Sequence, residues 1–166
     1  MDTVRFRHAH FSARFPAGHR YAPSHFWMAR AEGTDGDIWR VGMTKFATRM
    51  LGELVEMVLD VVPGQKVSGG QRLGTVEGFK AVSDLFCVME GEFVEANPLL
   101  RSESCLTHSD PHGNGWLYSI RGVPAEGETD VHGYVALLTE TVDRLHASRY
   151  SGSAPLAGDG DEGPPP

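Results

Sequence analysis

Residues 77–84 read Glu-Gly-Phe-Lys-Ala-Val-Ser-Asp, and the interpretation of the chain starts from this stretch. Strand-like sequence precedes and follows it, which predicts a hairpin of residues 71–77 and 82–88 with residues 78–81 at its tip. A glycine in the tip allows the positive φ that tight turns often require. A lysine at such a tip, here Lys80, projects into solvent, where a modifying enzyme can reach its amine and an attached group can swing. Because most exposed lysines are only solvated surface groups, the tip needs support from the rest of the sequence.

Short apolar stretches separated by turn-forming residues predict a mainly β fold around this hairpin. The predicted strands cover residues 26–31, 38–43, 53–62, 92–96 and 116–120, and residues 32–37 join the first two as a hairpin. In the strand over residues 53–62, alternation places four apolar side chains opposite Glu56 and Asp60. These four are Val55, Met57, Leu59 and Val61.

Two helices are expected among the strands. Thr44 is placed to cap a short helix that ends at Gly52. Apolar residues recur at helical spacing over residues 131–147, with Thr129 or Asp130 as the cap. The apolar positions of this second helix are Val135, Leu138, Val142 and Leu145. The polar segment 101–115 is expected to be irregular.

A chain of 166 residues fits one domain. The sequence predicts an N-terminal extension over residues 1–15, one domain over residues 16–148, and a tail over residues 149–166. The tail is acidic and rich in glycine and proline, so it is expected to be disordered because it cannot bury a core.

The N-terminal extension is rich in Arg and His. Val4 and Phe6 alternate with Arg5 and Arg7, which predicts a short strand. An organelle transit peptide is the alternative interpretation. The pair of histidines at positions 8 and 10 lacks the further ligands that a stable metal site needs, so no metal is expected.

The composition excludes several classes of function. A formal net charge of −7 and a pI near 5.5 leave no basic footprint for nucleic acid. No apolar run approaches the roughly 20 residues of a membrane span, and no secretory signal is visible, so a cytoplasmic protein is expected. Cys87 and Cys105 are expected to be reduced thiols. The only lysines are Lys45, Lys66 and Lys80, so a modification of lysine has three candidate sites.

The stretch around Lys80 resembles the lipoylation site of glycine cleavage H-proteins, where a Glu-x-x-Lys-Ala turn is followed by Ser-Asp or Ser-Glu and then Leu. The matching residues here are Glu77, Lys80, Ala81, Ser83, Asp84 and Leu85. The resemblance covers about residues 16–148. Its further matches are Pro16, Tyr21, His25, Trp27, Val41-Gly42-Met43-Thr44, Phe46-Ala47, Leu51-Gly52-Glu53, Gly91-Glu92, Asn97, Leu106, Pro111 and Gly115-Trp116-Leu117.

The resemblance implies a lipoyl-domain fold, a flattened barrel or sandwich of two antiparallel sheets with short helices and a C-terminal helix. It implies a non-catalytic carrier with lipoate amide-linked to Lys80. The implied partners are a pyridoxal phosphate (PLP) glycine decarboxylase, which loads an aminomethyl group, and a tetrahydrofolate-dependent aminomethyltransferase, which removes the carbon. An FAD dihydrolipoyl dehydrogenase would reoxidise the dithiol, and a lipoyl ligase or transferase would attach the cofactor.

Four residues near Lys80 are expected to contribute to the cofactor site: Glu77, Gly78, Ser83 and Asp84. The two acids would form a recognition surface for the modifying enzyme, because amide formation removes the charge of the lysine. Ser83, Asp84 and Glu53 are candidates to hydrogen-bond the charged aminomethyl arm. The sequence departs from the family pattern at Lys45, Phe46, Phe79, Val88, His108 and His112.

Other interpretations stay open. One is an H-like paralogue that carries lipoate for sulfur metabolism or lipoyl relay, and another is a non-lipoylated binding module with the same fold. A biotin carrier is disfavoured because its lysine normally sits between methionines. A lipoyl domain of a 2-oxoacid dehydrogenase is disfavoured by the Trp and Gly pattern and the C-terminal helix. An enzyme is disfavoured because no Ser-His-Asp set or phosphate loop is present, and His25 and Trp27 are expected to pack in the core.

Overall fold

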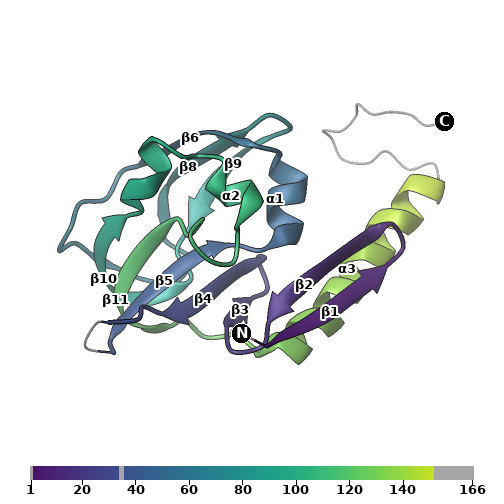
Figure 1. Cartoon of the computed structure of the whole chain (residues 1–166), viewed down its shortest axis with the longest axis horizontal. Helices are drawn as coiled ribbons and strands as arrows, with labels where there is room; N and C mark the ends of the chain where they lie inside the picture. The colour runs from purple at the N-terminus through teal and green to yellow at the C-terminus, as the bar shows by residue number, and fades with distance from the viewer. Residues whose placement is uncertain (1, 34–35, 152–166) are drawn as a thin grey trace.

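The computed structural model describes residues 2–33 and 36–151 and consists mainly of antiparallel sheets (Figure 1). The strands are β1 (Thr3–His8), β2 (Phe11–Pro16), β3 (Arg20–Ala22), β4 (Phe26–Arg30), β5 (Ile38–Met43), β6 (Leu54–Leu59), β7 (Lys66–Val67), β8 (Arg72–Gly78), β9 (Val82–Phe86), β10 (Met89–Ala96) and β11 (Tyr118–Pro124). The helices are α1 (Lys45–Leu51), the 3-10 helix η1 (Pro98–Arg101), α2 (Leu106–Ser109) and α3 (Val131–Ser151). Of the predicted tail over residues 149–166, residues 149–151 belong to α3 and the rest lies outside the described residues.

Two antiparallel sheets enclose the main core, which confirms the predicted sandwich. One sheet has the strand order β3-β4-β5-β11-β10-β7, and the other has the order β6-β8-β9. Fully buried side chains from both sheets meet between them, among them Val41 and Ile120 from the larger sheet and Leu73 and Leu85 from the smaller one. The hydrogen-bonded strands of the described residues do not close on themselves, so the fold is an open sandwich rather than a closed barrel.

The smaller sheet carries the predicted Lys80 hairpin, since β8 pairs with β9 and with β6. The register of β6 shifts between Leu54 and Glu56. At a β-bulge the alternation of side chains is interrupted, so residues before the bulge face the other side of the sheet from where a regular strand would place them. Val55 is therefore 49% exposed, and its predicted place on the same face as Met57, Leu59 and Val61 is wrong.

The other predicted elements are present, with corrections at their ends. The β4–β5 hairpin forms, and α1 begins after Thr44, whose hydroxyl accepts a hydrogen bond from the Ala47 amide at 3.3 Å. The strands predicted over residues 92–96 and 116–120 correspond to β10 and β11. The prediction that residues 101–115 are irregular is wrong, because this segment contains α2 and the last residue of η1.

Helix α3 begins after Asp130, whose carboxylate accepts a hydrogen bond from the Gly133 amide at 2.9 Å. Its buried face consists of Val131, Tyr134, Leu138 and Val142. Leu138 and Val142 lie on this face as predicted and Val135 is partly buried beside it, whereas Leu145, nearer the end of the helix, is 39% exposed. Within residues 2–33 and 36–151, no helix is long and apolar enough to cross a membrane.

The N-terminal extension folds into a hairpin, with β1 and β2 in register from Thr3 opposite Pro16 to His8 opposite Phe11. This hairpin lies against α3 at one side of the sandwich (Figure 1). A second core forms there, separate from the main one. Its aromatic members include Phe6, Phe11, Phe15, Tyr21, Trp27, Phe46, Trp116 and Tyr134. The extension is therefore integrated into the fold by aromatic packing.

Replacing Phe15 by alanine tests this integration. Phe15 is fully buried and packs edge-on against Tyr21 at 6.1 Å and Tyr134 at 5.3 Å between ring centroids. Truncating such a ring leaves a cavity, so we expect the free energy of unfolding in urea to fall by about 3–5 kcal/mol. Ser12→Ala, on the exposed face of the same hairpin, is the control and should change it by less than about 0.5 kcal/mol. Similar values for both variants would show that the hairpin is not part of the cooperative fold.

Candidate functional site at the Lys80 hairpin

The tip between β8 and β9 is fixed by backbone hydrogen bonds. Within the turn, the Gly78 amide donates to the Ala81 carbonyl at 2.8 Å. Two further amides of the tip donate to the end of α1 and to the residues just after it: Lys80 to the Leu51 carbonyl at 2.9 Å, and Phe79 to the Glu53 carbonyl at 3.0 Å. The backbone of the lysine is therefore held against the end of a helix on a rigid platform.

Two glycines make this close approach possible. A Cβ on Gly78 would lie 2.3 Å from the Leu51 carbonyl oxygen, and a Cβ on Gly52 would lie 2.9 Å from the Lys80 nitrogen. Gly52 also has φ of 83°, in the left-handed region that favours glycine. Gly78 is not among the residues with positive φ. The glycine in the tip is thus required for space, and the expectation that it supplies positive φ is wrong.

The Lys80 side chain is exposed, as predicted. Its amine donates one hydrogen bond, to the Arg49 carbonyl at 3.0 Å. No acid among the described residues forms an ion pair with this amine. Among the described residues, the amine is therefore held in place by this one hydrogen bond.

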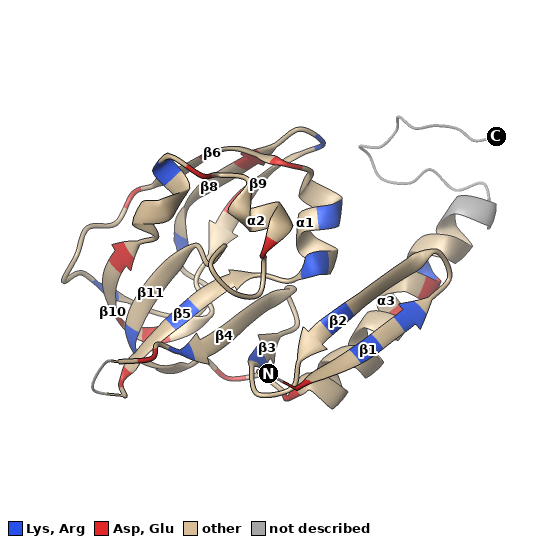
Figure 2. Cartoon of the chain, viewed as in Figure 1, with Lys and Arg blue, Asp and Glu red and all other residues tan. Residues whose placement is uncertain are grey.

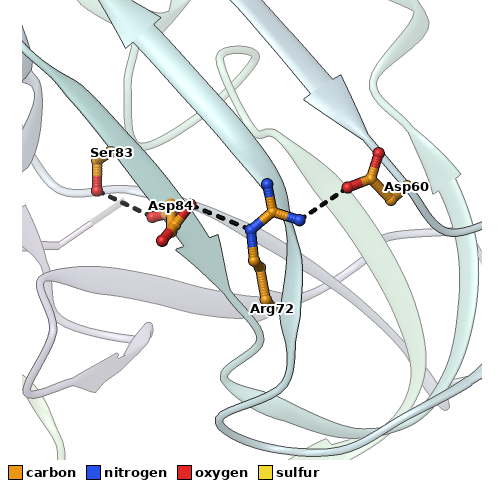
Figure 3. Close-up of polar contacts among 4 residues, drawn as sticks. All are labelled: Asp60, Arg72, Ser83 and Asp84. Carbon is orange, nitrogen blue, oxygen red and sulfur yellow. Dashed lines mark hydrogen bonds and ion pairs between the residues drawn. The ribbon is translucent and has the colours of Figure 1, made fainter.

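The predicted site residues are only partly brought together. Asp84 lies in a surface network in which Arg72 donates to Asp84 at 3.1 Å and to Asp60 at 2.8 Å (Figure 3). These two carboxylates raise the pKa of Arg72. The Ser83 hydroxyl donates to the Asp84 carbonyl at 2.9 Å. Ser83 and Asp84 are thus occupied within the smaller sheet.

Glu77 and Glu53 remain beside the tip. Glu77 is exposed and directly precedes Gly78, at the end of β8. Glu53 contributes to the site through its backbone, because its carbonyl accepts the hydrogen bond of the Phe79 amide. The carboxylate nearest to the lysine in sequence is therefore that of Glu77.

An apolar rim around the lysine was not singled out as functional from the sequence. Phe79 is 76% exposed and Val82 is 69% exposed, and the two flank Lys80. Met50 and Val55 on neighbouring elements are also about half exposed. Burying such side chains against a partner is favourable, at about 25 cal/mol per Å² of apolar surface. The signal available in the sequence was the bulky residue immediately before the lysine.

His25 and Trp27 pack in the second core, as expected. The His25 imidazole hydrogen-bonds the Tyr134 hydroxyl at 2.8 Å and packs on Phe46 with a ring separation of 4.7 Å. The indole of Trp27 donates to the Pro111 carbonyl at 2.8 Å. Burial lowers the pKa of His25 to about 4, and Arg144 adds to this effect. These groups support the structure around α1.

His112 is a second structural histidine. Its Nε2 accepts a hydrogen bond from the Lys45 amide at 3.0 Å, in the first turn of α1. Burial, with smaller contributions from His19 and Lys45, lowers the pKa of His112 to about 4. Protonation would remove this acceptor and place a positive charge at a helix N-terminus, where it is unfavourable.

The fold and the tip together define the class of protein: a β-sandwich that presents one exposed lysine on a rigid turn. The described residues contain no group of three or more His, Cys, Asp or Glu able to hold a metal ion. Comparison with known proteins identifies the family. The model of the glycine cleavage H-protein family matches residues 19–140, and the chain belongs to this family. It is therefore a carrier protein and not an enzyme.

Individual relatives support the same assignment. The chain is 34% identical over 121 residues to the glycine cleavage system H protein of Corynebacterium jeikeium, a match that covers 73% of this chain and 94% of the relative. It is 39% identical over 125 residues to the H protein of Alteromonas mediterranea, covering 74% and 94% respectively. The crystal structure of the H protein from Mycobacterium marinum has a TM-score of 0.64 at 35% identity, covering 74% of this chain and 97% of that one.

The contact at Gly78 can be tested by adding a methyl group. We expect Gly78→Ala to lower the free energy of unfolding by about 1–3 kcal/mol, because the new Cβ forces the tip away from the Leu51 carbonyl. Hydrogen exchange of the Lys80 amide should accelerate more than that of amides in β11. Gly18→Ala is the control, since a Cβ there meets nothing within 4 Å. Unchanged protection of the Lys80 amide in Gly78→Ala would contradict the proposed role of this glycine.

The two buried histidines predict a loss of stability in acid. Their pKa values are near 4 in the folded state, against about 6.5 in the unfolded chain. The unfolded chain therefore binds protons first, and the free energy of unfolding falls as the pH drops from about 6.5 toward 4. At pH 5 we expect a loss of about 1–2 kcal/mol for each imidazole relative to pH 7.5, measured by urea unfolding.

His112→Gln tests the assignment, because the amide oxygen of glutamine can accept the Lys45 hydrogen bond without titrating. The free energy of unfolding of this variant should fall less between pH 7.5 and 5.0 than that of the chain without the substitution. His132→Gln, at an exposed position on α3, should retain the full loss. An equal pH dependence in all three proteins would show that the drop has another source.

Proposed function

We propose that Lys80 is acylated by lipoate and that the lipoyl arm carries an aminomethyl group through the glycine cleavage system. The arm would take this group from a PLP-dependent glycine decarboxylase and deliver it to a tetrahydrofolate-dependent aminomethyltransferase. An FAD-containing dihydrolipoyl dehydrogenase would then reoxidise the dithiol. A lipoyl ligase or transferase would attach the cofactor, and the proposal places these steps in the cytoplasm.

The observation that carries the proposal is the combination of a fixed backbone and a free side chain at Lys80. Its amide is bound to the Leu51 carbonyl, whereas its amine is exposed and makes a single hydrogen bond. A fixed attachment point raises the effective concentration of a tethered group at each partner, provided that the arm itself can move. The family assignment supports the same cofactor.

The surroundings of the tip suggest separate roles for its neighbours. Acylation removes the positive charge of Lys80, and the exposed Glu77 would remain as a negative mark for the modifying enzyme. Phe79 and Val82 would contact the apolar entrance of an active site. Asp84, the second acid of the recognition surface, would have to release Arg72 before it binds a charged arm, and Ser83 would have to release the Asp84 carbonyl.

The proposed carrier domain covers residues 16–148, with the β1–β2 hairpin as an added layer. Several departures from the family pattern lie where this layer meets the sandwich. Phe46 packs edge-on against Phe11 at 5.5 Å, and His112 lies 5.4 Å from Phe15 between ring centroids. These departures are explained by packing and do not favour a paralogous carrier over the glycine cleavage role.

Intact-mass measurement after co-expression with a lipoyl ligase tests the attachment site. We expect the native chain to gain the mass of one lipoyl group. Lys80→Arg should gain nothing, because a guanidinium is not acylated, and the exposed Lys66→Arg should be modified like the native chain. A lipoyl group retained in Lys80→Arg would move the site elsewhere, and an unmodified native chain would favour a binding module.

Exchange of glycine carboxyl carbon with CO₂, measured with purified glycine decarboxylase, tests the pathway. The lipoylated chain should support exchange, and Lys80→Arg should reduce it by at least about 100-fold, since the acceptor is lost. A lipoylated chain that supports no exchange but accepts sulfur species would favour the paralogous role.

A further inference from the structure

The outer face of the β1–β2 hairpin carries arginines. Arg5, Arg7 and Arg14 are exposed and alternate along their strands with the buried Phe6 and Phe15. This alternation puts all three guanidinium groups on the face opposite the second core. The hairpin therefore has one aromatic face that anchors it and one basic face that is turned outward.

The pairing of the two strands concentrates this charge. Arg5 lies directly opposite Arg14 in the antiparallel register, and Arg7 lies opposite Ser12. Like charges at directly opposed positions destabilise a sheet. Within the described part of the chain, no carboxylate forms an ion pair with any of the three arginines. Within the described residues, the face therefore places like charges opposite each other without an ion-pair partner.

The opposed arginines also border a shallow depression. It has a volume of about 290 Å³ and is lined by Arg5, Ser12, Ala13 and Arg14. Two guanidinium groups at one depression supply hydrogen-bond donors and positive charge, and guanidinium groups bind carboxylates with paired hydrogen bonds. The chemistry of the lining therefore fits carboxylate side chains.

The opposite, aromatic face of the hairpin contacts the helix that lies beside Lys80. Phe11 of the hairpin contacts α1, where the Arg49 guanidinium lies 5.6 Å from its ring centroid. The carbonyl of the same Arg49 accepts the hydrogen bond of the Lys80 amine. Figure 2 shows Lys and Arg on β1, β2 and α1 on this side of the molecule, with Asp and Glu on α3 behind the hairpin. A single residue of α1 thus bridges the hairpin and the carrier lysine.

We propose that Arg5, Arg7 and Arg14 form a docking surface for a carboxylate-rich patch on one of the enzymes that receive the arm of Lys80. This inference rests on the proposed function, because it requires enzymes that approach the tip. A protein interface of standard size covers about 800 Å² per partner, equivalent to a disc of roughly 16 Å radius. The Lys80 tip and the hairpin both contact Arg49 of α1, so an enzyme that binds the tip approaches the hairpin as well.

Attraction between opposite charges at the rim of an interface mainly accelerates association and orients the partner. The remainder of this chain has a net negative charge, so a basic face on one side would favour one orientation of approach. The hairpin lies outside residues 19–140, the part that matches the family model. The docking surface is accordingly an addition to the carrier scaffold.

Direct binding measurements test the proposal without requiring lipoate. The dissociation constant for each of the three enzymes is measured at 50 and 500 mM NaCl, with the whole chain carrying Lys80→Arg. The test variant adds Arg5→Glu and Arg14→Glu. The matched control adds Lys66→Glu and Arg101→Glu, which change the net charge equally at exposed positions on β7 and η1.

We expect the test variant to raise the dissociation constant for at least one enzyme on the order of tenfold at 50 mM NaCl and less than about twofold at 500 mM. The control should change it by less than about twofold at both salt concentrations. An equal effect of both variants, or no effect of the hairpin variant, overturns the docking surface. Arg5→Gln with Arg14→Gln provides a second test if charge reversal unfolds the hairpin.

The chain also contains an acidic segment that could compete for the same face. Asp159, Asp161 and Glu162 lie beyond the described residues. If the arginine substitutions change the dissociation constant less after deletion of residues 152–166, the tail is the occupant of the basic face and the partner proposal is overturned. Failure of the proposed function is distinguished separately, because it appears as an unmodified native chain in the mass measurement.

Discussion

The position of Lys80 depends on two backbone hydrogen bonds, from the amides of Phe79 and Lys80 to the carbonyls of Glu53 and Leu51. Each bond alone contributes about 1 kcal/mol, but together they dock a hairpin tip onto the end of a helix. The glycines at positions 52 and 78 allow this contact, because any side chain would fill the space that the backbones occupy. The smaller sheet, the cap of α1 and the packing beneath them all serve to keep these carbonyls in place.

The sequence predicted the Lys80 tip, the β4–β5 hairpin and the cap of α1, since each has a local signal in turn residues, alternation or capping chemistry. Features that depend on long-range pairing were not predictable in the same way. The bulge that exposes Val55 arises from the register of β6 against β8. The engagement of Asp84 by Arg72 arises from the pairing of β8 with β9, which brings together residues twelve positions apart.

The N-terminal extension shows the same limit. Alternation over residues 4–7 indicated a strand, but its partner strand and its packing on α3 follow from aromatic contacts with distant residues. Phe46 and His112 looked like unexplained departures until the structure placed them against Phe11 and Phe15. The side chains at positions 46 and 112 are therefore part of the contact between the sandwich and the hairpin. This contact adds a layer whose outer face carries arginines.

The tip is fastened through main-chain atoms, which every amino acid supplies. The carbonyls of Leu51, Glu53 and Arg49 hold the lysine whatever side chains those positions bear, provided that the helix keeps its course. Evolution can therefore change the chemistry of the surrounding surface, from Phe79 to the arginines of the hairpin, without displacing Lys80. A scaffold of this kind separates the position of the tip from the character of the surface around it, so that each can diversify independently.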